Sequence, residues 1–449
     1  MLFKDMLFIE YIQITLSLSP MKRFLTLALG VLVLSFAACQ AADQPRYGRY
    51  FTDDRLRIDL IFAGNASEQF AYLDGLVWEK GWSGTRRNLI PPFDYGEYAT
   101  DVYAADGKLI FSRGFSSLFQ EWRTTAEAEK VNRAFTNSAW IPFPKGKVTV
   151  AVTARVPETG GHRELLRFEV DPADPAISRE AENDFKVVPW MVNGPSAKKV
   201  DLCIVAEGYR AEDMEKFHAD VERMMGYLFN IEPFKSRKGD FNVWTVESVS
   251  QDAGTDIPHQ GIWRNTAACS NFYTFGIDRY LTAPDHKAVA RLASGAPNDA
   301  IYVLVNEEKY GGGGIYNYYA LSTADNARTE YVFVHEFGHS FAGLGDEYYE
   351  SDVAYENMYP AGVEPWEPNI TTQAHFDRKW QDLIQPGTPI PTPNDSSYIG
   401  VVGLFEGGGY SAKGVWRPYF ECRMKNNTAP GFCPVCQRAI NKMIDYYVK

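Results

Sequence analysis

Residues 331–341 read Tyr-Val-Phe-Val-His-Glu-Phe-Gly-His-Ser-Phe, with the pattern His-Glu-x-x-His at His335, Glu336 and His339. On an α-helix, residues four positions apart lie one turn above each other on the same face. Two imidazoles at that spacing can bind one zinc ion, and the glutamate between them then lies beside the water on the metal. The apolar turn at 331–334 predicts a buried helix, whose polar side chains need partners that a metal can provide. The alternative is a pair of core histidines with other hydrogen-bond partners.

A third ligand is expected just after this helix, because a catalytic zinc site has three protein ligands and one position for water. Gly343 or Gly345 should end the helix, and Asp346 follows at once. The spacing His-Glu-x-x-His-x-x-x-Gly-x-x-Asp places the glycine and the third ligand one residue later than in the metzincin motif. Glu347 is the alternative third ligand and Glu356 ranks behind it. The remaining possibility is that Asp346 is a solvated carboxylate at the helix end.

Further along the chain, Met424 follows Glu421-Cys422-Arg423. Metzincins carry a methionine in a tight turn beneath the zinc, and we predict that Met424 is this residue. The alternative is an ordinary core methionine. Tyr348 and Tyr349 are candidates for a tyrosine that stabilises an oxyanion.

The composition is that of an ordinary globular protein. The chain has 449 residues, which suits two domains, with 45% hydrophobic and 23% charged residues. Its net charge of −12 argues against nucleic acid as a partner and against a polybasic membrane-binding surface.

Residues 1–39 are predicted to be a signal segment. Met21-Lys22-Arg23 gives a positive start, for which Met21 is a candidate true N-terminus, and an apolar run from Phe24 to Ala38 follows. Phe36-Ala37-Ala38-Cys39 is similar to a bacterial lipoprotein box, in which Cys39 would carry an outer-membrane lipid anchor. The alternative is ordinary cleavage nearby. Both predict an exported protein that is periplasmic, a cell-surface lipoprotein or extracellular.

The other cysteines are odd in number, so at least one is a free thiol. Cys203 lies in an apolar strand and is predicted to be buried and free. Cys422, Cys433 and Cys436 are close in the sequence and could form a disulfide. They could also bind a second, structural zinc, although no fourth ligand lies nearby in the sequence.

Residues 45–190 are predicted to form a β-sandwich. Apolar and polar residues alternate around Leu56–Phe62 and Val148–Ala154, and Asp106-Gly107 is a hairpin signal. Short strands with turns between them are typical of two packed antiparallel sheets.

Residues 195–449 are predicted to form an α/β domain. The continuous apolar run 200–206 indicates a strand covered on both faces. A helix at 214–228 and strands at 241–246 and 300–305 follow it, which is typical of a largely parallel sheet. The glycines at 311–314 predict a flexible bend before an edge strand near 315–320, to which an extended peptide could pair.

These residues resemble the bacterial immunoglobulin-A-peptidase family of zinc metallopeptidases. The matching segments are His335 to Tyr348, Glu207-Gly208-Tyr209, Phe405 to Tyr410, Arg417-Pro418 and Cys422-Arg423-Met424, and the β-rich part, including 114–122, is similar to the family's N-terminal domain. The resemblance implies an all-β sandwich followed by an α/β, metzincin-like zinc peptidase domain. It also implies an exported endopeptidase with a protein or peptide substrate, which need not be immunoglobulin.

The predicted function is hydrolysis of peptide bonds by a water that zinc activates. In this hypothesis His335, His339 and Asp346 hold Zn²⁺ and Glu336 is the general base. The alternative is a non-catalytic surface binding protein that uses its β-sandwich and carries a structural metal. The intact Glu336 argues against that alternative, because a structural site needs no glutamate there and is usually closed by four ligands.

Overall fold

The computed structural model describes residues 44–179, 184–349 and 359–449. Residues Arg46–Lys449 form one compact unit. The predicted signal segment, the lipidation site Cys39 and the third-ranked metal ligand Glu356 lie outside the described residues. Within the described ranges, no helix combines the length and the apolar character that a membrane span requires.

The first part of this unit is β-rich. A three-stranded antiparallel sheet has β1 (Phe51–Gly64) between β2 (Gln69–Glu79) and β5 (Arg133–Pro144). A four-stranded antiparallel sheet follows in the order β4-β3-β6-β7. Its strands are β3 (Tyr98–Ala104), β4 (Leu109–Phe115), β6 (Val148–Arg155) and β7 (His162–Val170), and two short helices, α3 (Tyr47–Tyr50) and α4 (Leu118–Arg123), accompany the sheets.

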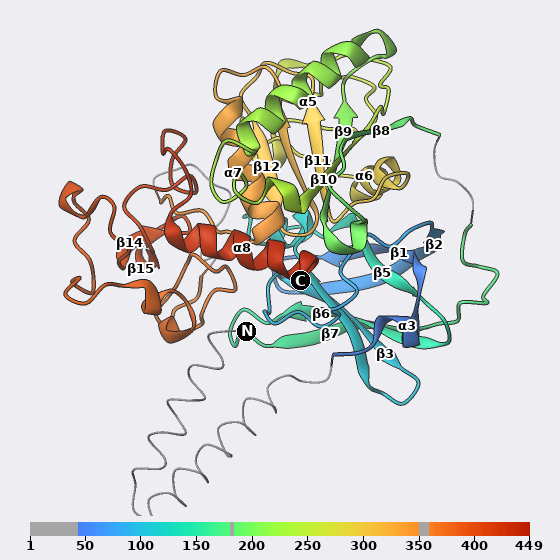
Figure 1. Ribbon diagram of the computed structural model, residues 1–449, viewed down its shortest axis with the longest axis horizontal. Helices are drawn as coiled ribbons and strands as arrows, with labels where there is room; N and C mark the ends of the chain where they lie inside the picture. The colour runs from blue at the N-terminus through green and yellow to red at the C-terminus, as the bar shows by residue number, and fades with distance from the viewer. Residues whose placement is uncertain (1–43, 180–183, 350–358) are drawn as a thin grey trace, which may run out of the picture. The chain divides into compact units, whose positions relative to one another are not determined.

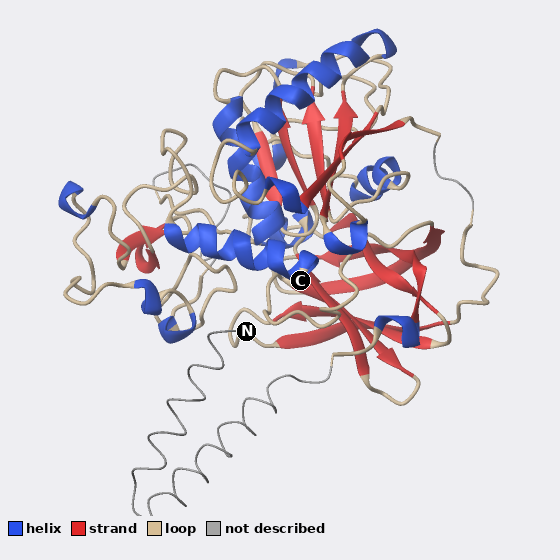
Figure 2. Ribbon diagram, viewed as in Figure 1, coloured by secondary structure: helices blue, strands red, loops and turns tan. Residues whose placement is uncertain are grey.

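The two sheets share a core because every second residue of each strand points inward. The alternating residues Leu56, Ile58 and Phe62 of β1 are buried with Val150 and Val152 of β6 in one cluster. The ring of Phe62 lies 4.5 Å from that of Tyr98 on β3, which joins the two sheets. The strands at the bottom of Figure 2 are these two sheets.

The second part is built on a mixed six-stranded sheet in the order β12-β13-β11-β9-β10-β8. The inner strands β13 (Tyr319–Thr323), β11 (Ala300–Val305), β9 (Val200–Glu207) and β10 (Phe241–Val246) are parallel, whereas β12 (Gly312–Ile315) and β8 (Val187–Met191) are antiparallel edges. All residues of β9 and β11 are buried, as their continuous apolar runs predict. Four of the five residues of β8 lie within the range 45–190, yet β8 pairs with β10 of this second sheet.

Helices cover both faces of the six-stranded sheet. α5 (Met214–Leu228), α7 (Thr329–Ala342) and α8 (Pro434–Val448) share one core with the sheet face that carries Leu202 and Ile204. α6 (His286–Ala293) packs on the opposite face, with Cys203 and Val205, in the cluster that also contains the core of the β-rich part. The two parts therefore share a continuous core. Figure 1 shows α5 and α7 beside the six-stranded sheet.

The described residues between α7 and α8, 343–349 and 359–433, are mostly loop. Among them, β14 (Phe405–Gly408) and β15 (Ser411–Arg417) form a small hairpin. Short 3-10 turns complete the described secondary structure: Ser196–Lys198, Ala211–Asp213, Lys238–Asp240, Pro258–Gln260, Thr274–Gly276, Phe376–Arg378, Gln381–Leu383 and Ser396–Tyr398.

The glycine run differs from its prediction as a flexible bend. Gly312 to Gly314 are themselves part of the edge strand β12, which pairs with β13. A Cβ atom on Gly314 would lie 2.3 Å from the carbonyl oxygen of Glu336, and one on Gly312 would lie 2.6 Å from Val332. The glycines therefore allow β12 to lie directly against α7, at a distance that no side chain permits.

Candidate metal centre

Helix α7 places the two histidines of the sequence pattern on one face. It ends at Ala342, and the next residue, Gly343, caps it in the left-handed conformation with φ of 64°. The N–H groups of Gly343 and Leu344 donate to the carbonyl oxygens of His339 and Gly338, which satisfies the last turn of the helix. The predicted helix end is thus confirmed, and the chain reverses direction immediately after it.

The reversal brings Asp346 to the two histidines. Nε2 of His335 lies 3.0 Å from Nε2 of His339. Oδ1 of Asp346 lies 3.1 Å from the first nitrogen and 3.2 Å from the second. Oδ1 is buried and receives no hydrogen bond. Three potential ligand atoms therefore meet at one point.

The other nitrogen of each imidazole indicates which atoms face this point. Nδ1 of His335 is 2.9 Å from the carbonyl oxygen of Arg423, and Nδ1 of His339 is 2.5 Å from that of Leu344. A carbonyl oxygen only accepts, so both Nδ1 atoms carry the proton. In the neutral imidazoles both Nε2 atoms then present lone pairs to Asp346. Such outer contacts are those that fix ligating histidines in metal sites.

The electrostatics of the three groups favour a positive charge between them. Burial would by itself lower the pKa of His339, but the Asp346 carboxylate outweighs it and raises this pKa to about 9. Burial would raise the pKa of Asp346, but the two histidines hold it well below its usual range. A cation at the meeting point of the three ligand atoms satisfies the same attraction without a proton on either histidine. The residues therefore fit a metal ion.

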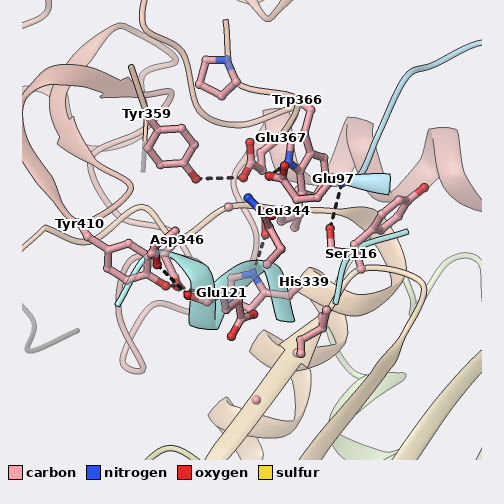
Figure 3. A pocket seen from close by; sticks show the side chains of 18 of the residues that line it. Glu97, Ser116, Glu121, His339, Leu344, Asp346, Tyr359, Trp366, Glu367 and Tyr410 are labelled. Carbon is pink, nitrogen blue, oxygen red and sulfur yellow. Dashed lines mark hydrogen bonds and ion pairs between the residues drawn. The ribbon is translucent and has the colours of Figure 1, made fainter. Parts of the chain in front are cut away.

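Tyr410 is a further residue of this centre that the sequence analysis did not single out. Its hydroxyl donates to Oδ2 of Asp346, and Gly409 N–H donates to the Asp346 carbonyl oxygen at 2.8 Å. The turn of the β14–β15 hairpin thus holds both the side chain and the backbone of Asp346. Figure 3 shows the side-chain contact between Tyr410 and Asp346. The glycine-rich sequence before Tyr410 marks a turn, but it does not show which residue the turn contacts.

The structure does not bring Glu347 to the histidines. Its Oε1 lies 3.1 Å from Sγ of Cys436 and belongs to a separate group of side chains. Tyr348 lines the cavity beside the histidines, whereas Tyr349 is not among its lining residues. Tyr349 instead packs against Arg417, whose Cζ atom lies 5.6 Å from the centre of the Tyr349 ring.

Met424 lies beneath the turn of α7 that carries the histidines. It is fully buried, and a Cβ atom on Gly338 would lie 3.0 Å from its sulfur. The glycine between the two histidines therefore makes room for this methionine. The Met424 carbonyl oxygen also accepts a hydrogen bond from Glu347 N–H at 2.8 Å.

The three groups open into a cavity of about 290 Å³. Glu336 lines it beside the histidines, and burial raises the pKa of this carboxyl. Part of its lining comes from Gly312 to Tyr316, at the edge of the six-stranded sheet, and another part comes from the β-rich part. The lining residues of the β-rich part include Glu97, Ser116, Ser117, Gln120, Glu121 and Arg155.

Comparison with known families agrees with this geometry. Residues 188–399 and 394–444 match the family described as IgA Peptidase M64, which is more than half of the chain. The chain belongs to this family. Residues 46–163 match the model described as Peptidase M64 N-terminus, and no curated protein matches the chain.

Membership of the M64 family supports a peptidase function, and a metallopeptidase type follows from the family. The suspected relationship to immunoglobulin-A peptidases is thereby confirmed. Both matched regions contribute to the cavity, because the N-terminal match contains Ser116 and Glu121 and the peptidase match contains the histidines. The indole of Trp366 donates to Oε1 of Glu97 at 2.8 Å and ties the two regions together at the cavity wall (Figure 3).

Proposed function

We propose that the protein is an exported zinc-dependent endopeptidase in which His335, His339 and Asp346 hold the metal. The observation that carries this proposal is the meeting of two imidazole Nε2 atoms and a buried carboxylate oxygen, each within 3.2 Å of the others. Two histidines and one carboxylate are a donor set typical of catalytic zinc. The group has three protein ligands and adjoins a cavity, which suits catalysis better than a closed structural site. We therefore prefer an enzyme to a non-catalytic binding protein.

When bound, zinc would polarise the scissile carbonyl and make a water more acidic. Glu336 would accept the proton of that water and then pass it to the leaving amine. Burial raises the pKa of Glu336, which makes its carboxylate a stronger base and its acid form a usable proton donor. Asp346 would be held as a ligand by Tyr410, and His335 by the Arg423 carbonyl oxygen.

The substrate would be an extended peptide that runs antiparallel to β12. This strand is an edge of the sheet and lines the cavity, and sheet edges bind peptides by strand addition. Gly312 forms a bridge with Tyr280 at one end, and the carbonyl oxygen of Tyr316 accepts a hydrogen bond from Ser116 N–H at the other. The edge available to a peptide is therefore Gly313 to Ile315. We infer that the β-rich part, whose residues line the same cavity, contributes to the substrate groove.

Two further elements of the proposal come from the sequence. Met424 would be the methionine of a metzincin-like turn, consistent with its place beneath α7. The positive and apolar segment 21–38 supports export, with Cys39 as the site of a lipid anchor or ordinary cleavage nearby.

A digest of an unbiased peptide library with and without a chelator tests the proposal. We expect internal cleavage that the chelator abolishes and added zinc restores. His339→Ala should lose cleavage, whereas His375→Ala, at an exposed histidine outside the cavity, should cleave normally. Cleavage that persists after the metal is removed, or in His339→Ala, would show that the centre is not catalytic.

A further inference from the structure

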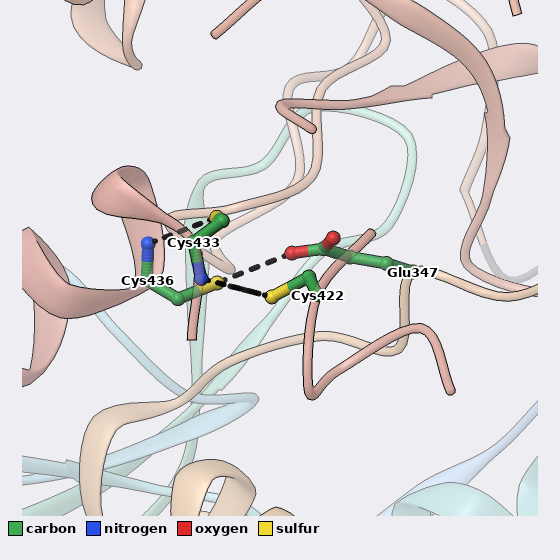
Figure 4. A group of neighbouring side chains, drawn as sticks. All are labelled: Glu347, Cys422, Cys433 and Cys436. Atoms are coloured by element: carbon green, nitrogen blue, oxygen red, sulfur yellow. Dashed lines mark hydrogen bonds between the residues drawn. The ribbon is translucent and has the colours of Figure 1, made fainter. Parts of the chain in front are cut away.

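A second group of potential metal ligands lies away from the cavity. Glu347, Cys422, Cys433 and Cys436 are all buried, and their ligand atoms lie within 4.8 Å of one another (Figure 4). The three cysteines come from the loop before α8 and its first turn, whereas Glu347 comes from the segment just after α7. The fold thus supplies the fourth ligand that is missing from the neighbouring sequence.

The distances suit a metal ion better than a disulfide. Sγ of Cys422 and Sγ of Cys436 are 3.7 Å apart, whereas bonded sulfurs are about 2.05 Å apart. Zinc–sulfur bonds of about 2.3 Å at tetrahedral angles place two sulfurs about 3.8 Å apart. All three cysteines are free in the structure. The expected disulfide is therefore absent from these described residues.

The environment of the Glu347 carboxylate indicates that a positively charged ligand binds there. Its Oε1 accepts hydrogen bonds from Asn369 at 2.9 Å and from Cys436 at 3.1 Å. Its Oε2 is buried and has no hydrogen-bond partner, and the whole residue is 0% exposed. A buried carboxylate oxygen without a partner is costly, and a cation among the sulfurs would supply that partner.

Backbone N–H groups donate to the sulfurs of two of the three cysteines. Cys433 N–H donates to Sγ of Cys422 at 3.3 Å, and Cys436 N–H donates to Sγ of Cys433 at 3.5 Å. Cys433 is the N-cap of α8, a helix of 15 residues, and the positive end of a helix stabilises negative sulfur. The pattern Cys-Pro-Val-Cys also has the spacing of zinc ligands in structural sites.

We propose that Glu347, Cys422, Cys433 and Cys436 bind a second zinc ion in a closed, structural site. Binding transfers the three thiol protons to the solvent, so that three thiolates and one carboxylate surround the divalent ion. The excess negative charge is partly offset by the buried guanidinium of Arg417, which interacts electrostatically with Glu347.

The second site would hold in place the backbone that supports the catalytic ligands, next to Asp346 and at Arg423. Glu347 directly follows Asp346, and Cys422 directly precedes Arg423, whose carbonyl oxygen accepts from His335 at 2.9 Å. Glu347 N–H also donates to the Met424 carbonyl oxygen at 2.8 Å. One ion at the second site would thus fix the backbone on both sides of the catalytic ligands. Zinc binding at the second site does not depend on peptidase activity, whereas its support of the first centre rests on the proposed catalytic zinc.

Zinc content of the full chain, purified under reducing conditions and measured by elemental mass spectrometry, tests the second site. We expect two zinc ions per chain in the wild type and one in Cys433→Ser. Cys203→Ser is the matched control, because Cys203 is a buried thiol of β9 outside both groups, and it should keep two. One ion per chain in the wild type, with Cys433→Ser unchanged, would overturn the proposal.

Cobalt substitution distinguishes the two sites without reference to activity. Only the second group contains sulfur, so a sulfur-to-cobalt charge-transfer band reports on it alone. We expect this band in the wild type and in His339→Ala, and its loss in Cys433→Ser. A cobalt-loaded wild type without the band, or a disulfide-linked peptide among the three cysteines in the purified chain, would contradict the proposal even if the variants fail to fold.

The coupling between the two sites has its own readout. Cys433→Ser should bind the catalytic zinc roughly 10–100-fold more weakly, as is typical when outer contacts of a metal site are lost. Competition with a chelator measures this affinity. An unchanged affinity in a variant that has lost the second ion would show that the second site does not position the catalytic ligands.

Discussion

Replacing Gly314 by alanine tests how the close approach of β12 to α7 positions Glu336. A Cβ atom at this position would lie 2.3 Å from the carbonyl oxygen of Glu336 and 3.0 Å from its Cα atom. Comfortable contacts between such atoms are about 3.5 Å. The strand and the helix must therefore separate by about 1 Å.

The expected cost follows from this displacement. Overpacking of this kind destabilises a protein by about 1–3 kcal/mol, and a misplacement of about 1 Å in an active site reduces the rate about 100-fold. The proposed ligands lie on α7 and just after it, not on β12. We therefore expect Gly314→Ala to keep its metal, to lose about 100-fold in kcat/KM and to melt at a lower temperature.

The assay compares three quantities in Gly314→Ala and a matched control. They are kcat/KM on a peptide found in the library digest, zinc content, and the thermal midpoint by calorimetry. The control is Gly226→Ala in α5, where a Cβ atom meets nothing within 4 Å and where alanine favours the helix by up to about 1 kcal/mol. If Gly314→Ala had the same kcat/KM and the same thermal midpoint as the wild type, the packing argument would be refuted.

Three further variants examine the metal centre and the core. Tyr410→Phe removes the donor to Asp346 and should weaken zinc binding roughly 10–100-fold in chelator competition; wild-type affinity would contradict this. Burial lowers the pKa of His286 to about 3, whereas its value in the unfolded chain is about 6.5. The unfolded chain therefore binds a proton first as the pH falls, and the free energy of unfolding should decrease by about 2 kcal/mol between pH 7 and pH 5. Denaturant titrations at pH 7 and pH 5 measure this decrease, which should be about 2 kcal/mol smaller in His286→Gln than in the wild type. An equal decrease in both proteins would contradict the prediction. Glu79→Ala leaves the buried Arg55 guanidinium without its carboxylate partner at 2.6 Å and should destabilise the fold by about 3–5 kcal/mol; an unchanged melting temperature would be the contrary result.

The elements that could be predicted from the sequence depend on local patterns. The apolar runs of β9, β10 and β11 and the spacing of α5 each lie within a few consecutive residues, and the structure has these elements in the expected places. The end of α7 at Gly343 has an equally local cause, because the left-handed conformation there favours glycine.

The contacts that could not be predicted join residues far apart in the chain. Tyr410 reaches Asp346, and Glu347 reaches Cys436, only because the segment after α7 lies against the β14–β15 hairpin and the start of α8. No local pattern records such pairings. A strand of glycines also has no side chains that could show a period of two, so the sequence predicts a bend where the structure has β12.

The contribution of the β-rich part to the cavity is also a long-range property. Ser116 and Glu121 lie more than 200 residues before His335 in the sequence, yet they line the same cavity. They reach it because the buried residues of the β-rich part form one cluster with the face of the six-stranded sheet that carries Cys203 and Val205.

The most direct test of the central claim is to measure zinc content and peptide cleavage together in Glu336→Gln. This substitution keeps the shape of the side chain and leaves His335, His339 and Asp346 intact. We expect full zinc occupancy with cleavage reduced about 10²–10⁴-fold, the usual contribution of a general base. A zinc-loaded Glu336→Gln that cleaves as fast as the wild type would contradict the assignment of the base.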